Sequence, residues 1–75
     1  MVNVVTDIRK RLGISRMEIA RRTGISYGTL CLLERGGLKR VSDKNAIILA
    51  AFVGKTVKDV QQEYLIWRLA LRQRG

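Results

Sequence analysis

Apolar residues recur along this 75-residue chain at intervals of three and four, the spacing of one face of an α-helix. Glycines at positions 13, 24, 36–37 and 54 interrupt the pattern and leave five segments of helical length. The segments run over about residues 3–12, 15–23, 26–35, 42–53 and 56 onward. Proline is absent, and dense β-branched alternation, which would indicate strands, is missing. The pattern therefore predicts an all-α fold.

Small polar residues mark where several of these helices begin. Ser15 and Glu18 form the capping-box pattern S-x-x-E, and Thr56 and Asp59 form a second one. The Ser26 hydroxyl can cap the free N–H groups of the third helix. These residues predict the starts of the second, third and fifth helices.

The apolar faces differ from helix to helix. In the first segment, Val4, Val5, Ile8 and Leu12 share one face. The fourth is apolar almost all round, so we expect it to be the central core helix; it holds Ala46, Ile47, Leu49, Ala50 and Phe52. The fifth carries a narrow seam with 3-4-3-4 spacing, formed by Val57, Val60, Tyr64, Trp67 and Leu71. Further apolar surface lies beside this seam at Leu65, Ile66, Leu69 and Ala70.

The charge balance changes this picture from a generic helical domain to one with a polyanionic partner. The chain has 15 Lys and Arg residues against 6 Asp and Glu, a formal net charge of +9. Nucleic acid is the first candidate and an anionic membrane surface the second. The longest apolar run, residues 46–53, is far shorter than the roughly 20 residues that span a bilayer. With no signal-peptide pattern visible, we expect a soluble, cytoplasmic protein without a membrane partner.

Several kinds of chemistry are disfavoured by the residues present. One cysteine, Cys31, and no histidine exclude an internal disulfide and a conventional zinc site within one chain. Grouped carboxylates and a phosphate loop are missing, and the chain is too short to enclose a pocket. We therefore expect no enzyme, no cofactor, no metal and no small-molecule ligand, and we interpret Cys31 as a small filler residue.

Residues 15–35 have the pattern of two short helices joined by a tight turn. Gly24 makes the turn, and Ile25 plugs the hinge. Ala20 is small enough for the two helices to cross closely, while Leu30 and Leu33 anchor the second one. This arrangement predicts a helix-turn-helix with its second helix exposed.

An ordered set of residues resembles the λ-repressor/Cro-like (XRE-type) helix-turn-helix family. It comprises Leu12-Gly13-Ile14-Ser15, Glu18-Ile19-Ala20, Gly24-Ile25-Ser26, and Leu30 through Leu33-Glu34-Arg35-Gly36. The likeness covers about residues 3–60. It implies a compact five-helix bundle with the motif at helices two and three and an extended C-terminal helix. Residues 1–60 would form the DNA-binding domain. Family domains often end near residue 60, so we interpret residues 61–75 as an extension of the last helix that serves dimerisation.

The resemblance also implies the site residues. The third helix would enter the DNA major groove and turn Tyr27, Gly28, Thr29 and Leu32 toward the bases. Phosphates would be gripped on one flank by Ser15 and Arg16, and on the other by Lys39, Arg40 and Ser42. Free N–H groups at a helix start favour phosphate on physical grounds as well. A salt bridge between Arg9 and Glu34 would tie the first helix to the third.

The base-facing positions depart from the family. Members commonly place Gln, Arg, Lys or Asn there, the side chains that bidentate readout of guanine or adenine requires. Here Tyr27, Gly28 and Leu32 stand instead. We expect specificity to rest on apolar contact, on Tyr27 and on DNA shape, with weak or lost base recognition as the alternative.

Arg21 and Arg22 are interpreted as a solvated helix face.

These features lead to one leading function and one alternative. The leading function is a sequence-selective transcription regulator of the phage, plasmid or mobile-element type, acting as a repressor. It would form a homodimer through Tyr64, Trp67 and Leu71 and read an inverted repeat in duplex DNA. The alternative is a helix-turn-helix repurposed to bind protein, as an antirepressor, antitoxin or polymerase-binding regulator. A membrane-surface helix at residues 64–74 explains the charge less economically.

Overall fold

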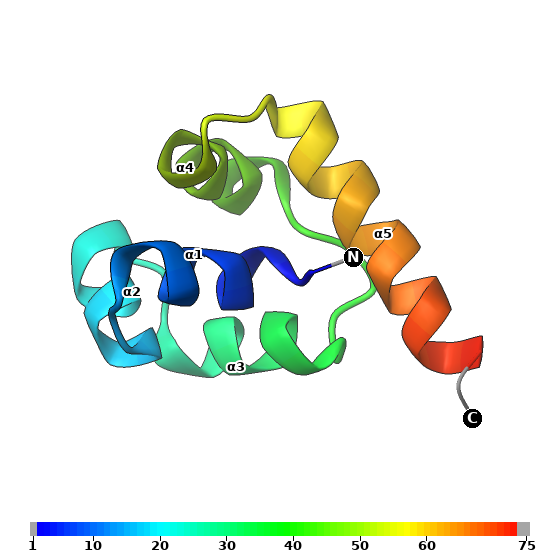
Figure 1. Cartoon of the computed structure of the whole chain (residues 1–75), viewed down its shortest axis with the longest axis horizontal. Helices are drawn as coiled ribbons and strands as arrows, with labels where there is room; N and C mark the ends of the chain where they lie inside the picture. Colours follow the sequence, from blue (N-terminus) through cyan, green and yellow to red (C-terminus); the bar gives the residue numbers. More distant parts are fainter. Residues whose placement is uncertain (1, 74–75) are drawn as a thin grey trace.

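The computed structural model describes residues 2–73, and over this range the chain forms five α-helices and no strand (Figure 1). They are α1 (Val4–Leu12), α2 (Arg16–Thr23), α3 (Tyr27–Arg35), α4 (Asp43–Val53) and α5 (Val57–Gln73). The expected all-α fold of five helices, with a long last helix, is therefore confirmed.

The predicted capping residues act at the helix starts. Ser15 Oγ accepts the Glu18 N–H at 3.1 Å, and Thr56 Oγ1 accepts the Asp59 N–H at 3.0 Å. At the turn between α2 and α3, Gly24 has φ +77°, a left-handed conformation that side chains with a Cβ rarely adopt. Since no atom lies within 4 Å of a Cβ built there, backbone conformation and not crowding requires this glycine.

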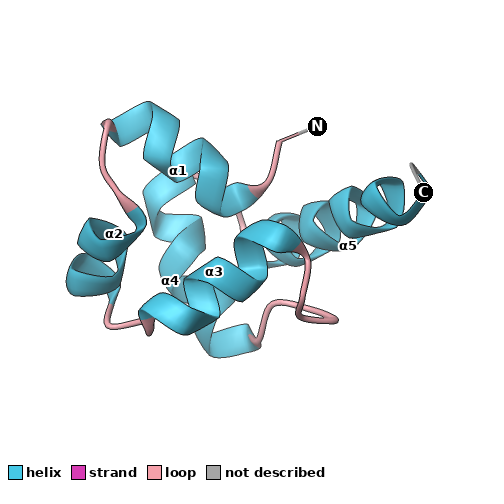
Figure 2. Ribbon diagram, turned by 90° about the horizontal axis from the view of Figure 1, so that it is seen from below, coloured by secondary structure: helices cyan, strands magenta, loops and turns pink. Residues whose placement is uncertain are grey.

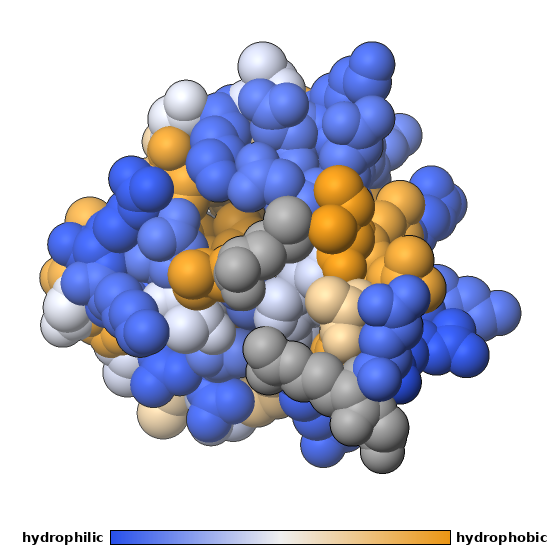
Figure 3. Space-filling view, turned by 45° about the vertical axis from the view of Figure 1, so that its right-hand side comes forward, coloured by the Kyte–Doolittle hydropathy of each residue, from blue (hydrophilic) through white to orange (hydrophobic). Residues whose placement is uncertain are grey.

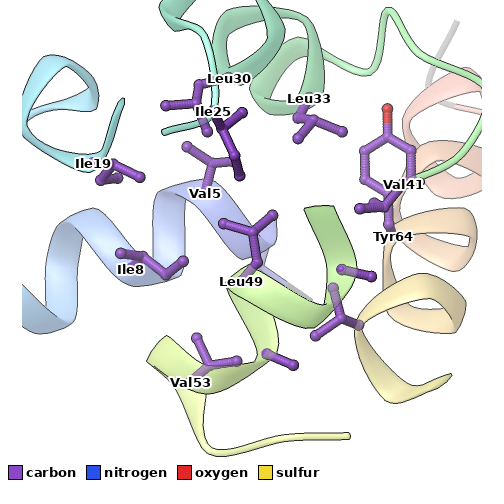
Figure 4. Close-up of a cluster of buried hydrophobic side chains, with 13 residues drawn as sticks. Val5, Ile8, Ile19, Ile25, Leu30, Leu33, Val41, Leu49, Val53 and Tyr64 are labelled. Atoms are coloured by element: carbon purple, nitrogen blue, oxygen red, sulfur yellow. The ribbon is translucent and has the colours of Figure 1, made fainter. Parts of the chain in front are cut away.

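One core joins all five helices (Figure 4). Val5 and Ile8 of α1 meet Leu30 and Leu33 of α3 there, and Leu49 of α4 packs with them. The remaining buried side chains include Ile19, Ile25, Val41, Ala46, Ala50, Val53, Val60 and Tyr64. Ile25, 5 % exposed, closes the hinge between α2 and α3 as predicted.

The expectation that α4 is the central core helix is wrong for its outer side, because Ile47 is 58 % exposed. Leu12, on the same face of α1 as Val5 and Ile8, lies at the helix end and is 44 % exposed. The α4 helix packs on α1 and α5, and in a domain this small no further layer covers its outer side. Therefore α4 supplies core residues from one side only.

Polar side chains at the start of the chain and on α1 donate hydrogen bonds to α3 and fix the two helices together. Asn3, 4 % exposed, accepts the Val5 N–H at its Oδ1 (2.9 Å) and donates from Nδ2 to the Leu33 carbonyl (2.9 Å). Arg9 Nη1 and Thr6 Oγ1 each donate to Glu34 Oε2 at 2.7 Å. The Arg9–Glu34 salt bridge is thus confirmed. The buried Asn3 link was not predicted, because a sequence pattern shows only its local capping role.

The inner face of α5 holds the α3–α4 loop (residues 36–42). Three side chains, at positions i, i+3 and i+7 of α5, donate to loop carbonyls: Gln61 to Val41 (2.9 Å), Tyr64 to Leu38 (2.6 Å) and Arg68 to Gly36 (3.0 Å). Burial raises the pKa of the Tyr64 hydroxyl. Part of the extension at residues 61–75 is therefore bonded to the rest of the domain.

The α5 seam faces its own chain, which corrects one expected interface residue. Tyr64 is 2 % exposed and belongs to the core, so it offers no surface to a second copy. Trp67 is partly buried and covers the end of α3, where a Cβ built on Gly36 would come within 3.2 Å of its ring. Leu71 contacts the same glycine but stays 41 % exposed. The 3-4-3-4 pattern thus marks the attachment of α5 to its domain.

Replacing Asn3 tests the link between α1 and α3. Asn3→Ala should lower the free energy of unfolding by about 2 kcal/mol, because it removes a helix cap and leaves the Leu33 carbonyl with only the long 3.4 Å hydrogen bond from the Gly36 N–H. Thr56→Ala removes only an exposed cap and should cost about 1 kcal/mol or less. Urea denaturation followed by circular dichroism measures both. Equal losses in the two variants would contradict a special role for Asn3.

Candidate nucleic-acid interface

The α3 helix lies on the surface between two flanking elements. Seen from below, it crosses the front of the molecule, with α2 on one side and the α3–α4 loop on the other (Figure 2). Leu30 and Leu33 are fully buried beneath it, while Tyr27 is 46 % exposed and Gly28 is also exposed. The core therefore holds α3 by its inner side and leaves its N-terminal turn open.

The four base-facing candidates differ in accessibility. Tyr27 and Gly28 form the exposed tip, and a Cβ built on Gly28 would meet no atom within 4 Å. Thr29 is partly buried, and its hydroxyl accepts a 2.8 Å hydrogen bond from Ser26. Leu32 is also partly buried, with its Cδ2 only 2.8 Å from a Cβ built on Gly37. Tyr27 and Gly28 are thus more open to a ligand than Thr29 and Leu32.

The start of α2 brings a cation next to this tip. Arg16, the first residue of α2, places its guanidinium carbon 5.6 Å from the centre of the Tyr27 ring. Its Nη1 lies 3.6 Å from Glu34 Oε1. Ser15 caps the helix beside it. Two residues predicted for separate roles, Arg16 and Tyr27, are therefore in contact, which their sequence spacing did not indicate.

The cations of the other flank form no ion pair with the carboxylates of the described residues. Lys39 and Arg40 are exposed on the α3–α4 loop, and Ser42 caps α4 by accepting the Asn45 N–H at 3.2 Å. Among the residues that the structure describes, no carboxylate lies within 4.0 Å of a charged nitrogen of Lys39 or Arg40. Lys44, exposed in the first turn of α4 and equally unpaired over that range, adds a charge that the sequence interpretation did not name.

The remaining arginines of α2 share one carboxylate on their own helix. Arg21 and Arg22 both donate to the Glu18 carboxylate. The hydrogen bonds from Arg21, and then from Arg22, hold the pKa of Glu18 down to about 2. This pairing is consistent with a solvated helix face, and Arg16 is the arginine of α2 that contacts residues of α3.

Other kinds of site receive no structural support in the described part of the chain. Cys31 is a free, partly buried thiol on α3. Between residues 2 and 73, no three Cys, Asp or Glu side chains gather as metal ligands would. Over the same residues, no helix has the length and apolar content needed to cross a bilayer.

Comparison with known families identifies the domain. A family model described as helix-turn-helix matches residues 5–60, which run from α1 into the first turn of α5. No curated protein and no solved structure matches the chain. The matched range contains α2, α3, the α3–α4 loop and both flanking groups of cations. The chain therefore belongs to the Cro/C1-type (XRE) family of helix-turn-helix DNA-binding regulators.

Proposed function

We propose that this protein is a sequence-selective repressor that binds an inverted repeat in duplex DNA as a homodimer. The observation that carries the proposal is the exposed N-terminal turn of α3 between two basic flanks. Arg16 lies on one flank, and Lys39 and Arg40 lie on the other. A control protein of the phage, plasmid or mobile-element type that covers its promoter fits this arrangement.

The flanks fit DNA backbone and the tip fits a groove. The starts of α2 and α4 offer unpaired N–H groups and partial positive charge, which favour phosphate. Such contacts fix the register of the protein on DNA without reading sequence. Sequence would then be read by the Tyr27 ring and by close approach of the backbone at Gly28, where no side chain intervenes.

The dimer, in this proposal, forms through the outer side of α5. Helical geometry places Gln62, Leu65, Ile66, Leu69 and Gln73, which we call the outer stripe, opposite the buried seam. Leu65, Ile66 and Leu69 are 47, 52 and 57 % exposed. Hydrophobic surface gathers on this side of the molecule, where α5 comes forward (Figure 3).

A second copy of the chain suits the outer stripe because the stripe is chemically symmetric. A two-fold axis midway between Ile66 and Leu69 pairs these two residues across antiparallel helices and brings Gln62 to Gln73. The stripe has no charge, so two chains of net charge +9 meet there without placing like charges in contact. Trp67 and Leu71 belong to the seam on the opposite side of α5, where they contact Gly36, so this proposal does not place them in the interface.

A selection experiment tests the proposed function. Purified protein is offered a pool of duplexes with a randomised centre at moderate ionic strength, in excess mixed-sequence competitor. We expect enrichment of an inverted repeat with half-sites about one helical turn apart. Recovery of no preferred duplex would overturn the proposal and would favour a helix-turn-helix that binds protein.

The phosphate contact of Arg16 predicts a change in salt dependence. Arg16→Ala should reduce the slope of log affinity against log salt concentration by about 1, because one phosphate contact is lost. Arg21→Ala is the matched control, since Arg21 is already paired with Glu18, and its slope should stay that of the wild type. Fluorescence anisotropy with a labelled duplex measures both. An unchanged slope in Arg16→Ala would remove Arg16 from the phosphate contacts.

Close approach of DNA at Gly28 predicts opposite effects on stability and binding. Space for a Cβ is open in the free protein, so Gly28→Ala should stabilise the fold by about 0.5 kcal/mol. The added methyl group would stand between backbone and DNA, so affinity should fall. Thermal unfolding and anisotropy check the two signs. A variant that is more stable and binds equally well would show that DNA does not approach here.

Charge placed on the outer stripe should separate the copies. Leu69→Glu should weaken self-association on the order of tenfold or more, because a carboxylate would be buried at the interface. Ile47→Glu alters an equally exposed residue on α4 and should leave association unchanged. Sedimentation equilibrium, with and without DNA, measures the oligomeric state. A wild-type monomer at high micromolar concentration in both conditions would contradict the dimer.

A further inference from the structure

Contacts around Arg16 assign it a second role. We propose that Arg16 determines specificity by fixing the Tyr27 ring, and that Glu34 is the positioning residue that fixes Arg16. The inference rests on the proposed binding of α3 to duplex DNA and names how that site reads it. The phosphate contact made by Arg16 would then set the position from which Tyr27 contacts a base.

Glu34 is a well-held carboxylate with one side left for Arg16. Its side chain is 13 % exposed, and its Oε2 accepts hydrogen bonds from Arg9 and Thr6, both at 2.7 Å. Its Oε1 is buried and has no hydrogen-bond partner, and it faces Arg16 Nη1 at 3.6 Å. That distance exceeds a hydrogen bond, so charge attraction alone draws Arg16 toward Glu34.

The same geometry leaves Arg16 available to a phosphate. One carboxylate faces two guanidinium groups, those of Arg9 and Arg16, so the group of three keeps a net positive charge. Arg16 keeps 35 % exposure of its side chain, and no hydrogen bond to Glu34 must break when a phosphate oxygen binds. Glu34 therefore restrains the direction of Arg16 without consuming its donors.

The Tyr27 ring is the other neighbour of this guanidinium. The 5.6 Å separation between the Arg16 guanidinium carbon and the ring centre lies within cation–π range. Tyr27 is 46 % exposed, so its ring is not locked by the core. A phosphate that fixes Arg16 therefore also fixes where the ring meets a base.

With Arg16 on a phosphate and Tyr27 on a base, the pair responds to the distance between that phosphate and that base edge, which is a property of DNA shape. It offers specificity to a helix tip that lacks the side chains of bidentate readout. Lys39, on the opposite flank, provides the contrast. It is exposed on its loop and makes no cation–π contact among the described residues, so it should hold phosphate without affecting base preference.

A double-mutant cycle tests the coupling. The probes are the duplex that wild-type protein enriches from the randomised pool and a mixed-sequence duplex of equal length. The quantity compared is the ratio of affinities for the two duplexes in Arg16→Ala, Tyr27→Leu and the double variant. Each single substitution should lower this affinity ratio. If the two residues are coupled, the ratio in the double variant should fall by a factor about two- to fivefold smaller than the product of the two single factors. Lys39→Ala should weaken both duplexes equally and keep the ratio.

Two further variants separate positioning from folding. Arg16→Lys keeps the charge but loses the flat guanidinium. The slope of log affinity against log salt concentration should therefore equal that of the wild type, while the ratio of affinities for the two duplexes falls. Glu34→Gln removes a negative charge, so binding to the mixed duplex should rise while the ratio falls. In the free protein, the ring-current shift of the Arg16 δ protons should vanish in Tyr27→Leu and shrink in Glu34→Gln.

Each outcome bears on one claim. Enrichment of no duplex overturns the proposed function. Enrichment of a duplex with strictly multiplicative losses in the cycle, or an Arg16→Lys variant with an unchanged ratio, overturns only this inference. If Glu34→Gln fails to fold, the Arg16→Lys result decides it.

Discussion

The way α3 is held is the constraint on which the rest of the structure depends. Leu30 and Leu33 bury its inner side, and polar contacts restrain its C-terminal half through the Leu33 carbonyl and the Glu34 carboxylate. Its N-terminal turn has no such restraint from the core and stands open at Tyr27 and Gly28. A helix fixed at one end and along one side can present the other end to a groove without losing its position.

Two elements place positive charge beside that open turn. On one side Arg16 begins α2, and on the other the α3–α4 loop carries Lys39 and Arg40. The loop is set by α5, whose inner face donates to three loop carbonyls. Since the proposed dimer forms on the outer face of the same helix, one element would link the distance between subunits to the phosphate contacts of each.

The sequence predicted what depends on local chemistry. Serine and threonine caps, the left-handed Gly24 and the 3.6-residue periodicity act within a few residues, so helix boundaries and the helix-turn-helix could be read directly. Periodicity also found both apolar stripes of α5, but it could not tell which of them meets the domain. For that reason Tyr64 was assigned to an interface between copies when it lies in the core.

Contacts between residues far apart in the sequence could not be predicted, because sequence patterns report only on interactions within a few residues. The Asn3 bond to Leu33 joins positions 30 apart, and the Tyr64 bond to Leu38 joins positions 26 apart. Only the Arg9–Glu34 pair, implied by the family resemblance, was expected. The cluster of Arg16, Glu34 and Tyr27 forms only once α2 and α3 are placed against each other, so sequence spacing could not show it.

The most direct test of the central claim is the mapping of amide chemical shifts on titration with the enriched duplex. If α3 enters a groove with its N-terminal turn, the largest changes should fall at residues 15–17, 26–29 and 39–43, on both flanks and the tip together. Changes concentrated along residues 62–73, with the α3 tip unmoved, would contradict the account.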